Sequence, residues 1–269
     1  MTQSNPTINI SEPLVIRENH SNSVVTLTLN RPKQFNALSV ELLTAMQKEL
    51  DSIAQDSNIR VVVIAAKGKA FCAGHNLKEM RAHSDEAFHN ALFQQCSQMM
   101  LTINQMPQVV IAKVQGIATA AGCQLVATCD LAVASDNAKF ATSGINVGLF
   151  CSTPAVALSR NLSRKQAFEM LITGEFIDAN TAMQQGLINR VAPTEQLDAT
   201  LQSLVDAIIN KSPMATATGK DMFYKQLDMD LANAYEYASK VMTCNMMADD
   251  VSEGIDAFIE KRQAVWKGQ

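Results

Sequence analysis

The segment between Gly116 and Asp130 contains small residues in an order that suits anion binding by main-chain amides. Its centre is Ala120-Ala121-Gly122, and we expect the segment to contain the start of a helix. The first N–H groups of a helix have no partner inside it, and the helix dipole favours negative charge beside them. The segment therefore predicts a site for an oxyanion. Tight packing of a helix on a sheet would also explain these small residues.

Short apolar segments predict the strands that hold this region. Residues 60–66 and 109–114 are continuous apolar runs, as expected of strands buried on both faces. Residues 24–29 alternate like a half-buried strand, and 130–135 and 189–192 predict two more. The apolar stretch after Gly116 predicts a helix. Strands that alternate with helices favour an α/β core.

Several helices are also indicated by their caps and apolar stripes. Ser39 is a good N-cap for a helix with Leu42, Leu43, Met46 and Leu50 on one face. Further helices are expected at 85–106, 163–174 and 178–186, and from Pro193 almost to the end. We therefore expect a core at residues 1–195 and a helical C-terminal region at 196–269, which covers the core or mediates assembly.

Composition narrows the functional classes. The chain has 269 residues, 47% of them hydrophobic and 18% charged, with a net charge of −4 and no basic block, so no nucleic-acid partner is expected. The longest apolar stretch, 117–129, is too short to span a bilayer. Residues 1–9 lack the features of a targeting peptide, which favours a cytoplasmic protein without a membrane partner. The six cysteines predict free thiols, mostly buried, and the scattered histidines predict no metal site.

The order and spacing of several short motifs make the chain similar to the enoyl-CoA hydratase/isomerase (crotonase) superfamily. The similarity begins near residue 14 and includes Leu29-Asn-Arg-Pro32, Phe35-Asn-Ala-Leu38, Phe71-Cys-Ala-Gly-His75, Gly116 to Asp130, Leu171-Ile-Thr-Gly174 and Phe258-Ile-Glu-Lys-Arg262. It is strongest to the divergent enoyl-CoA hydratase domain-containing paralogues, through Ala120 to Ala127 and Gly148 to Pro154. The resemblance implies a spiral of ββα units, a helical C-terminal trimerisation region, and a homotrimer or a dimer of trimers. It also implies an acyl-CoA thioester ligand whose coenzyme A belongs to the substrate, with no separate cofactor.

The same resemblance implies roles for individual residues. The amides of His75 and Ala121 would form the oxyanion hole, and the His75 imidazole would either be passive or act on the substrate. The ligand would be held by Lys33, Phe35, Ala37, Ala73, His75, Asn76 and Leu77, with Lys33 as a partner for phosphate. Phe258 and Lys261 match positions that reach a neighbouring subunit's ligand. Each lysine also has a simpler explanation as a solvated surface charge.

Two glutamates that hydratases of this superfamily use are replaced here by Gln124 and Gly144. A carboxamide can orient water but cannot exchange protons near neutral pH, and glycine has no side chain. Each lost acid–base group typically costs ~10²–10⁴ in rate. Asp130, Glu79 and Cys151 are the nearby substitutes in sequence, and each is more simply structural.

Some dihydroxynaphthoyl-CoA synthases, which the chain also resembles, have glycine at the second position and recruit bicarbonate. Thr142, Ser143 and Gly144 could hold such an anion.

Three hypotheses remain open from the sequence. The chain is an acyl-CoA enzyme that needs only the oxyanion hole, such as a decarboxylase or thioesterase. Alternatively, it is a non-catalytic acyl-CoA binder. The third is a nominal lyase of fatty acid metabolism, with residual hydratase activity through water held by Gln124.

Overall fold

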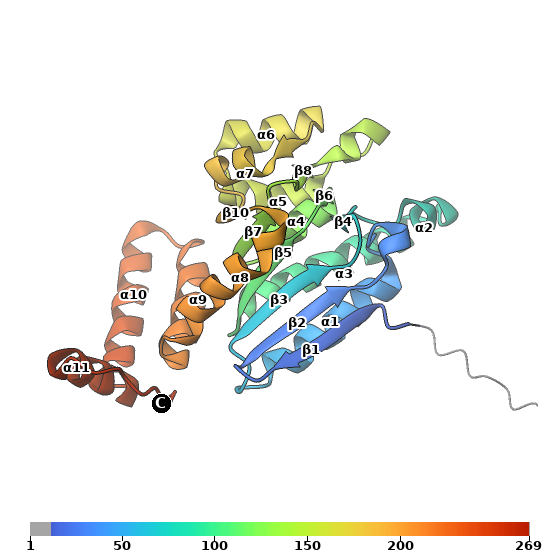
Figure 1. Ribbon diagram of the computed structural model, residues 1–269. Helices are drawn as coiled ribbons and strands as arrows, with labels where there is room; N and C mark the ends of the chain where they lie inside the picture. The colour runs from blue at the N-terminus through green and yellow to red at the C-terminus, as the bar shows by residue number, and fades with distance from the viewer. Residues whose placement is uncertain (1–11, 269) are drawn as a thin grey trace, which may run out of the picture.

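The computed structural model describes residues 12–268, which form two sheets enclosed by helices (Figure 1). The larger sheet is parallel except for its first strand, and the smaller one except for its last. The larger sheet has the order β1 (Val15–His20), β2 (Val24–Leu29), β3 (Val61–Ala66), β5 (Val109–Val114), β7 (Leu131–Ser135) and β10 (Arg190–Ala192). The smaller sheet has the order β4 (Ala70–Cys72), β6 (Ile117–Thr119), β8 (Lys139–Ala141) and β9 (Ile177–Asp178).

The chain alternates between the two sheets and then forms helices, and this repeats along the core. β3 and β4 precede α2 (Leu77–Ala82) and α3 (Glu86–Gln105), β5 and β6 precede α4 (Ala121–Thr128), and β7 and β8 precede α5 (Ser152–Asn161). This is the expected spiral of ββα units, and the α/β fold class is confirmed. The expectation of a helix directly after Gly116 was wrong for its first residues, because 117–119 pair with β4 and β8 as a strand.

Helix caps appear where the sequence indicated them. The Ser39 side chain accepts a hydrogen bond from the Leu42 amide at the start of α1 (Val40–Ala54). Asp85 accepts from the Phe88 amide at the start of α3, which packs against α1. α6 (Arg164–Thr173) and α7 (Ala179–Gln185) are likewise capped by Ser163 and Asp178. The structure thus confirms these predicted helix starts.

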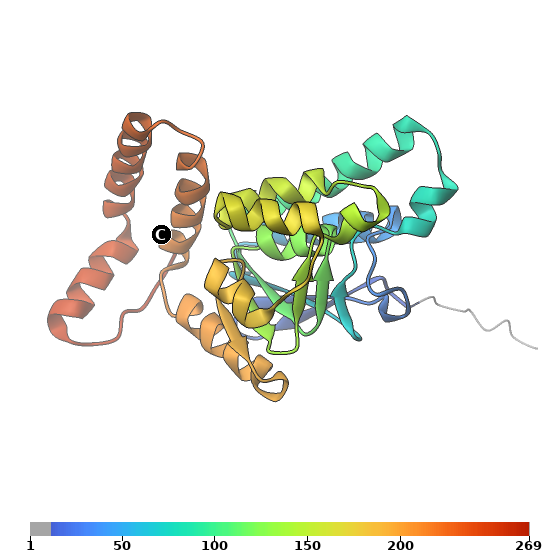
Figure 2. The same ribbon diagram turned by 90° about the horizontal axis from the view of Figure 1, so that it is seen from above.

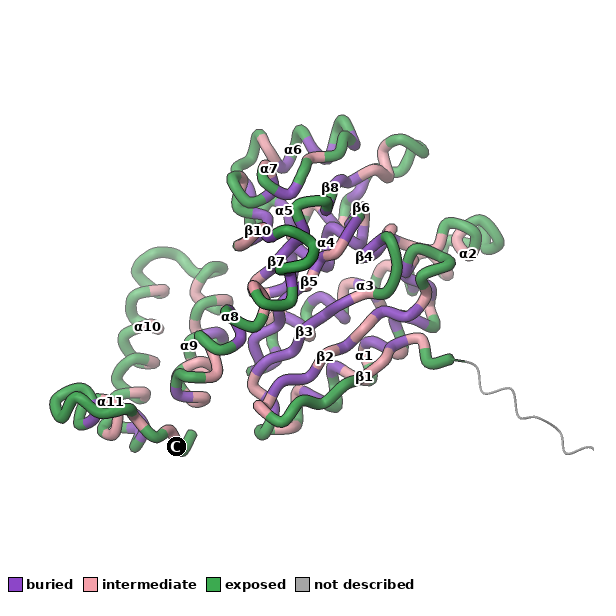
Figure 3. Tube along the Cα trace, in the orientation of Figure 1, coloured by how far each residue is buried: buried purple, intermediate pink, exposed green. Residues whose placement is uncertain are grey.

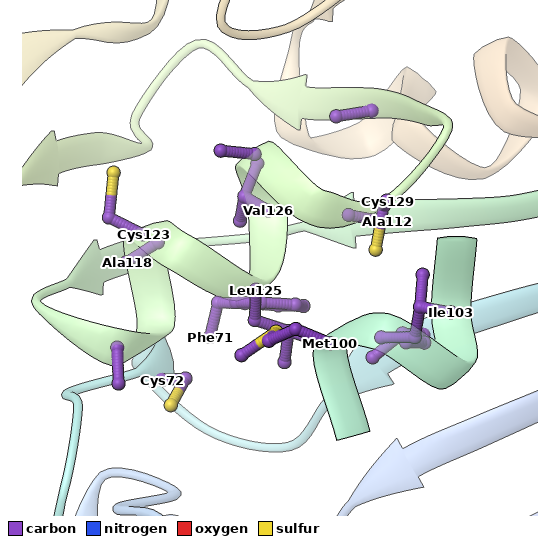
Figure 4. Packing of buried hydrophobic residues seen from close by; sticks show 14 of the residues in the cluster. Phe71, Cys72, Met100, Ile103, Ala112, Ala118, Cys123, Leu125, Val126 and Cys129 are labelled. Carbon is purple, nitrogen blue, oxygen red and sulfur yellow. The ribbon is translucent and has the colours of Figure 1, made fainter. Parts of the chain in front are cut away.

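The main hydrophobic core surrounds α4. All eight residues of this helix are buried, and Figure 4 shows Leu125 among Phe71, Met100 and Ile103. The purple segments in Figure 3 coincide with α4 and the central strands. Because α4 is enclosed on every side, its first turn is held rigidly. Five of the six cysteines are buried and all are free, whereas Cys244 is exposed.

The C-terminal region begins with a helix that belongs to the core. α8 (Leu197–Ile209) packs Leu197, Leu204 and Val205 on valines of β3 and β7, forming a second apolar cluster. α9 (Pro213–Gln226), α10 (Leu231–Met246) and α11 (Asp249–Glu260) stand beside the core, as Figure 2 shows. α10 has no buried residue, and its Leu231, Tyr235, Met242 and Met246 side chains are exposed. The division at residue 195 stays a prediction.

A buried ion pair joins this region to the core. The Lys220 ammonium on α9 donates to the Asp130 carboxylate at 2.6 Å and to the carbonyls of Ile103 and Gln108 at 2.7 and 2.8 Å. The Tyr224 hydroxyl donates to the other oxygen of Asp130 at 2.8 Å. Both charged groups are almost fully buried. Asp130 therefore has a structural role, as the sequence favoured.

The helices of residues 12–268 include none that is both long and apolar enough to cross a bilayer. In that same part of the chain, no group of three or more histidine, cysteine or acidic side chains is arranged to hold a metal ion.

Candidate functional site

The main-chain segments that carry His75 and Ala121 lie against each other. A Cβ atom built on Gly74 would be 2.8 Å from the Ala120 Cβ and 3.3 Å from the Ala121 nitrogen. Gly74 has a φ of +88°, and the Leu38 amide donates to its carbonyl at 2.8 Å. The Asn76 amide donates to the Leu38 carbonyl at 3.0 Å, so this bridge uses the carbonyl of Gly74 and the amide of Asn76, the residues on either side of His75. The amide of His75 is left without a backbone acceptor within residues 12–268.

The first turn of α4 is placed by an unusual backbone conformation. Ala120 has φ 51° and ψ −122°, a region that costs a residue with a side chain about 1–3 kcal/mol. Its own amide donates to the Ala141 carbonyl at 3.0 Å. Ala121 is the first helical residue, where the N–H has no partner inside the helix. A Cβ on Gly122 would lie 2.0 Å from the Cys72 carbonyl oxygen, so only glycine allows this approach.

Both segments border a cavity of about 260 Å³. No carboxylate, lysine or arginine is among the described residues that line it. Its walls are mostly apolar, with a few hydroxyls, one thiol and one imidazole. The lining residues are Ala73, His75, Leu77, Met80, Phe93, Ala120, Ala121, Ser143, Gly144, Val147, Leu149, Phe150, Cys151, Ser152, Thr153 and Pro154. Of the sequence-predicted site residues, the cavity brings together Ala73, His75, Leu77, Ala121 and Gly144.

The imidazole of His75 lies in an apolar environment. Its ring lies edge-on to Phe93, with 5.4 Å between centroids, and its Nε2 atom is buried without a hydrogen-bond partner in the described chain. Burial lowers the pKa of His75 to about 4. The ring is therefore neutral at physiological pH and brings no positive charge to the cavity.

Gln124 and Gly144, where the resemblance predicts that glutamates are replaced, differ in their surroundings. Gln124 is 4% exposed, its Oε1 has no partner within the described residues, and it does not line the cavity. At Gly144 the space is already filled, since a Cβ would lie 2.7 Å from the Leu149 carbonyl oxygen and 2.8 Å from Cys151 Sγ. Burial raises the pKa of the Cys151 thiol. Cys151 is therefore a neutral thiol at the cavity wall.

The other candidate acid–base groups are engaged elsewhere. Asp130 is bound to Lys220, and Glu79 accepts a hydrogen bond from the Val40 amide at 3.2 Å. Neither lines the cavity. The buried Thr142 hydroxyl donates to the Met170 carbonyl at 2.6 Å, and the Ser143 hydroxyl is 2.7 Å from that of Thr119. These bonds reduce what Thr142 and Ser143 can offer to a bicarbonate ion.

Four other residues predicted to hold the ligand, Lys33, Phe35, Ala37 and Asn76, lie at an edge outside the cavity. Lys33 belongs to a short 3-10 helix, Pro32–Gln34, and Phe35 and Ala37 follow it. Phe35 is 55% exposed. The Asn76 side chain accepts hydrogen bonds from two amides at the start of α2, so it caps that helix.

Two further lysines, which the sequence analysis missed, lie at this edge. The buried Asn36 side chain donates to the carbonyls of Lys67 and Ala70 at 2.9 Å. A Cβ on Gly68 would be 2.7 Å from the Pro32 Cβ, so the turn at 67–69 lies beside the 3-10 helix. Lys67 and Lys69, both exposed, therefore join Lys33 at one edge. The available signal was a Lys-Gly-Lys turn directly after a buried strand.

Phe258 and Lys261 are remote from the cavity of their own chain. Phe258 lies on α11 and is 85% exposed, and Lys261 follows that helix. α11 and α2 lie at opposite ends of the molecule in both ribbon views (Figures 1 and 2). Within a single chain the structure does not bring these two residues to the other predicted binding residues.

The fold and the paired amides define a crotonase-type protein, and comparisons with known proteins agree. Residues 19–269 match the sequence profile described as enoyl-CoA hydratase/isomerase, and the chain belongs to this family.

Two kinds of relative support this assignment. The chain is 45% identical to the rat mitochondrial enoyl-CoA hydratase domain-containing protein 3 over 256 residues, which covers 95% of this chain and 85% of the relative. A crystal structure of enoyl-CoA hydratase from Mycobacterium smegmatis is 54% identical and superimposes with a TM-score of 0.94, covering 95% and 99% of the two chains. The structure of human enoyl-CoA hydratase domain-containing protein 3 is 43% identical with a TM-score of 0.91, covering 94% and 100%.

Proposed function

We propose that this chain binds an acyl-CoA thioester and stabilises negative charge on its carbonyl oxygen through the amides of His75 and Ala121. The observation that carries the proposal is the approach of two unpaired main-chain donors at the wall of an apolar cavity. Preorganised donors of this kind are typically worth ~3–4 kcal/mol each toward an oxyanion. The site depends on backbone, so side-chain replacements elsewhere leave it intact.

The size of the cavity supports binding of the acyl end alone. Its volume of about 260 Å³ lies below the ~300–1,000 Å³ typical of pockets that enclose a drug-sized ligand. The nucleotide of coenzyme A would then lie outside, along the edge that carries Lys33, Lys67 and Lys69. Ammonium groups are suitable partners for its phosphates. Binding should accordingly weaken as salt concentration rises.

The chemistry we propose is weak or altered relative to efficient enoyl-CoA hydration. Gln124 and Gly144 stand at the two glutamate positions, and no carboxylate from the described chain lines the cavity. Residual hydration would rely on a water molecule that connects Gln124, which does not itself line the cavity, to the bound thioester. The second candidate function is a non-catalytic acyl-CoA binder. It is favoured because the cavity has an oxyanion site but no proton-transferring group. Decarboxylation, in which water protonates the enolate left by carbon dioxide, or thioester hydrolysis by a positioned water would use the two amides without the glutamates.

A test of this assignment separates binding from turnover. Calorimetry should detect hexanoyl-CoA binding, while crotonyl-CoA hydration by the unaltered protein should be slow. Gln124→Glu should raise hydration, whereas the matched control Gln124→Asn should not. Gly144→Glu is unsuitable, because its Cβ would meet the Leu149 carbonyl. Absence of binding would eliminate the proposal, and fast hydration by the unaltered protein would eliminate the altered chemistry.

We also propose a homotrimer or a dimer of trimers. The C-terminal helices leave large apolar side chains exposed, including Met242 at 71%, Met247 at 82% and Phe258 at 85%. Large apolar side chains exposed in number on a surface support association at that surface. A neighbouring subunit would then bring Phe258 and Lys261 to the ligand. Sedimentation analysis that finds only monomers would contradict this assembly.

A cytoplasmic location remains a prediction. The name of the rat relative places that protein in mitochondria. Residues 1–9, on which the prediction partly depends, lie outside the described residues.

A further inference from the structure

The cavity bordered by His75 and Ala121, called the acyl cavity below, is separated from a second hollow by a thin wall. This hollow is an open groove of about 420 Å³, lined by Phe93, Gln94, Ser97, Gln98, Leu101 and Thr153. Phe93 and Thr153 also line the acyl cavity. The two spaces therefore meet at this pair of side chains, one on α3 and the other in the first turn of α5.

The groove follows one face of α3. Phe93, Ser97 and Leu101 are spaced four residues apart, so their side chains lie above one another along the helix. Eight residues at about 1.5 Å each give the groove a length of about 12 Å beyond Phe93. Leu101, at its far end, is 50% exposed. The groove therefore continues from the cavity without reaching the core.

The ring of Phe93 is held in place by two imidazoles. His75 meets it edge-on, and the His89 ring is nearly parallel to it at 6.4 Å, with an interplanar angle of 22°. Aromatic pairs at these separations are stabilising and fix the ring orientation. Since Phe93 is also half-buried, it is a defined wall at the end of the cavity and not a loose surface side chain.

We propose that Phe93 limits the length of the acyl group by closing the cavity before the α3 groove. This inference rests on the proposed function, since it concerns the acyl-CoA ligand of the same site. At about 30 Å³ for each water-sized group, the cavity has room for eight or nine such groups. An acyl chain of up to about eight carbons fits, and a longer chain meets the Phe93 ring. Removal of the ring joins the cavity to the groove.

The test compares acyl-CoAs that differ only in chain length. Calorimetry with hexanoyl-, octanoyl- and dodecanoyl-CoA, below their micelle concentrations, gives dissociation constants for the unaltered protein and for Phe93→Ala. Phe93→Leu is a milder variant should Phe93→Ala fail to fold, as judged by thermal unfolding.

In the unaltered protein, dodecanoyl-CoA should bind no more tightly than octanoyl-CoA. In Phe93→Ala, dodecanoyl-CoA should bind about tenfold more tightly than octanoyl-CoA, because the added methylenes become buried in the groove. Phe93→Leu should fall between them. The inference is overturned if the length preference of Phe93→Ala matches that of the unaltered protein, or if the unaltered protein already favours dodecanoyl-CoA. Failure of every acyl-CoA to bind any variant would instead overturn the proposed function, and the inference with it.

Discussion

Replacement of Gly122 by alanine is the most direct test of the link between backbone packing and the oxyanion site. The added Cβ would lie 2.0 Å from the Cys72 carbonyl oxygen, whereas Cβ contacts below 3.0 Å essentially do not occur. The start of α4 and the end of β4 must therefore separate by about 1 Å. Cys72 leads into the His75 segment, and Gly122 follows Ala121. The separation thus moves the two donors apart.

The expected effects follow from this displacement. An oxyanion donor acts at 2.7–3.1 Å from the oxyanion. A shift of about 1 Å therefore removes most of the stabilisation that one donor gives an oxyanion, which is ~3–4 kcal/mol. A neutral thioester carbonyl in the bound ground state loses only about 0.5–1.5 kcal/mol, or roughly 2- to 10-fold in affinity. Overpacking of the core should lower stability by about 1–3 kcal/mol.

Infrared difference spectroscopy with hexanoyl-CoA labelled by carbon-13 at its carbonyl measures the donors directly. The carbonyl stretch should fall in frequency on binding to the unaltered protein and fall less in Gly122→Ala. The midpoint temperature of thermal unfolding should fall by about 2–4 °C for each kcal/mol of stability lost.

Gly219→Ala is the matched control, because Gly219 lies in α9 with open space around its Cβ position. It should leave the carbonyl frequency unchanged and stabilise the helix slightly. A Gly122→Ala variant with normal stability and a normal frequency shift would refute the reasoning.

Three further predictions concern charge. Because the pKa of His75 falls from 6.5 to about 4 on folding, its neutral form contributes stability that is complete above pH 6.5 and is lost as pH falls toward 4, by up to about 3 kcal/mol. Urea unfolding at pH 7 and pH 5 should show this loss in the unaltered protein and less of it in His75→Gln, and equal losses would contradict it. Lys220→Met should lower the free energy of unfolding by about 3–5 kcal/mol, because it leaves Asp130 buried without its cation, and the double variant with Asp130→Leu should recover much of that loss. Hexanoyl-CoA should bind at least about tenfold more tightly than adipoyl-CoA, because no described cation lines the cavity to pair with the free carboxylate of the adipoyl group. Equal affinities by calorimetry would contradict an uncharged cavity lining.

The sequence predicted the elements whose signals are local. The cap at Ser39, the apolar runs of β3 and β5, and the alternation of β2 all depend on neighbours in the chain. The three-residue strands of the smaller sheet were missed because they are defined by pairing with distant segments. β6 is the clearest case, because its composition resembles that of the helix that follows it.

The site was predictable only in part for the same reason. The small residues at 120–122 indicated close backbone approach, and the structure shows that approach to Cys72. No sequence pattern could reveal that Leu149 and Cys151 fill the space beside Gly144, because this depends on how the 143–151 segment folds back. The contact between the 3-10 helix at 32–34 and the turn at 67–69 is likewise a tertiary feature.

The buried Lys220 ammonium limits which of the C-terminal helices can be deleted, in evolution or in the laboratory. A chain shortened after α8 would keep the Asp130 carboxylate and the carbonyls of Ile103 and Gln108 but lose the cation that satisfies all three. Deletion of α9 to α11 should therefore weaken the sheet and α3 as well as any contact between subunits. The last three helices are not a detachable module, because α9 supplies one of the polar groups inside the core.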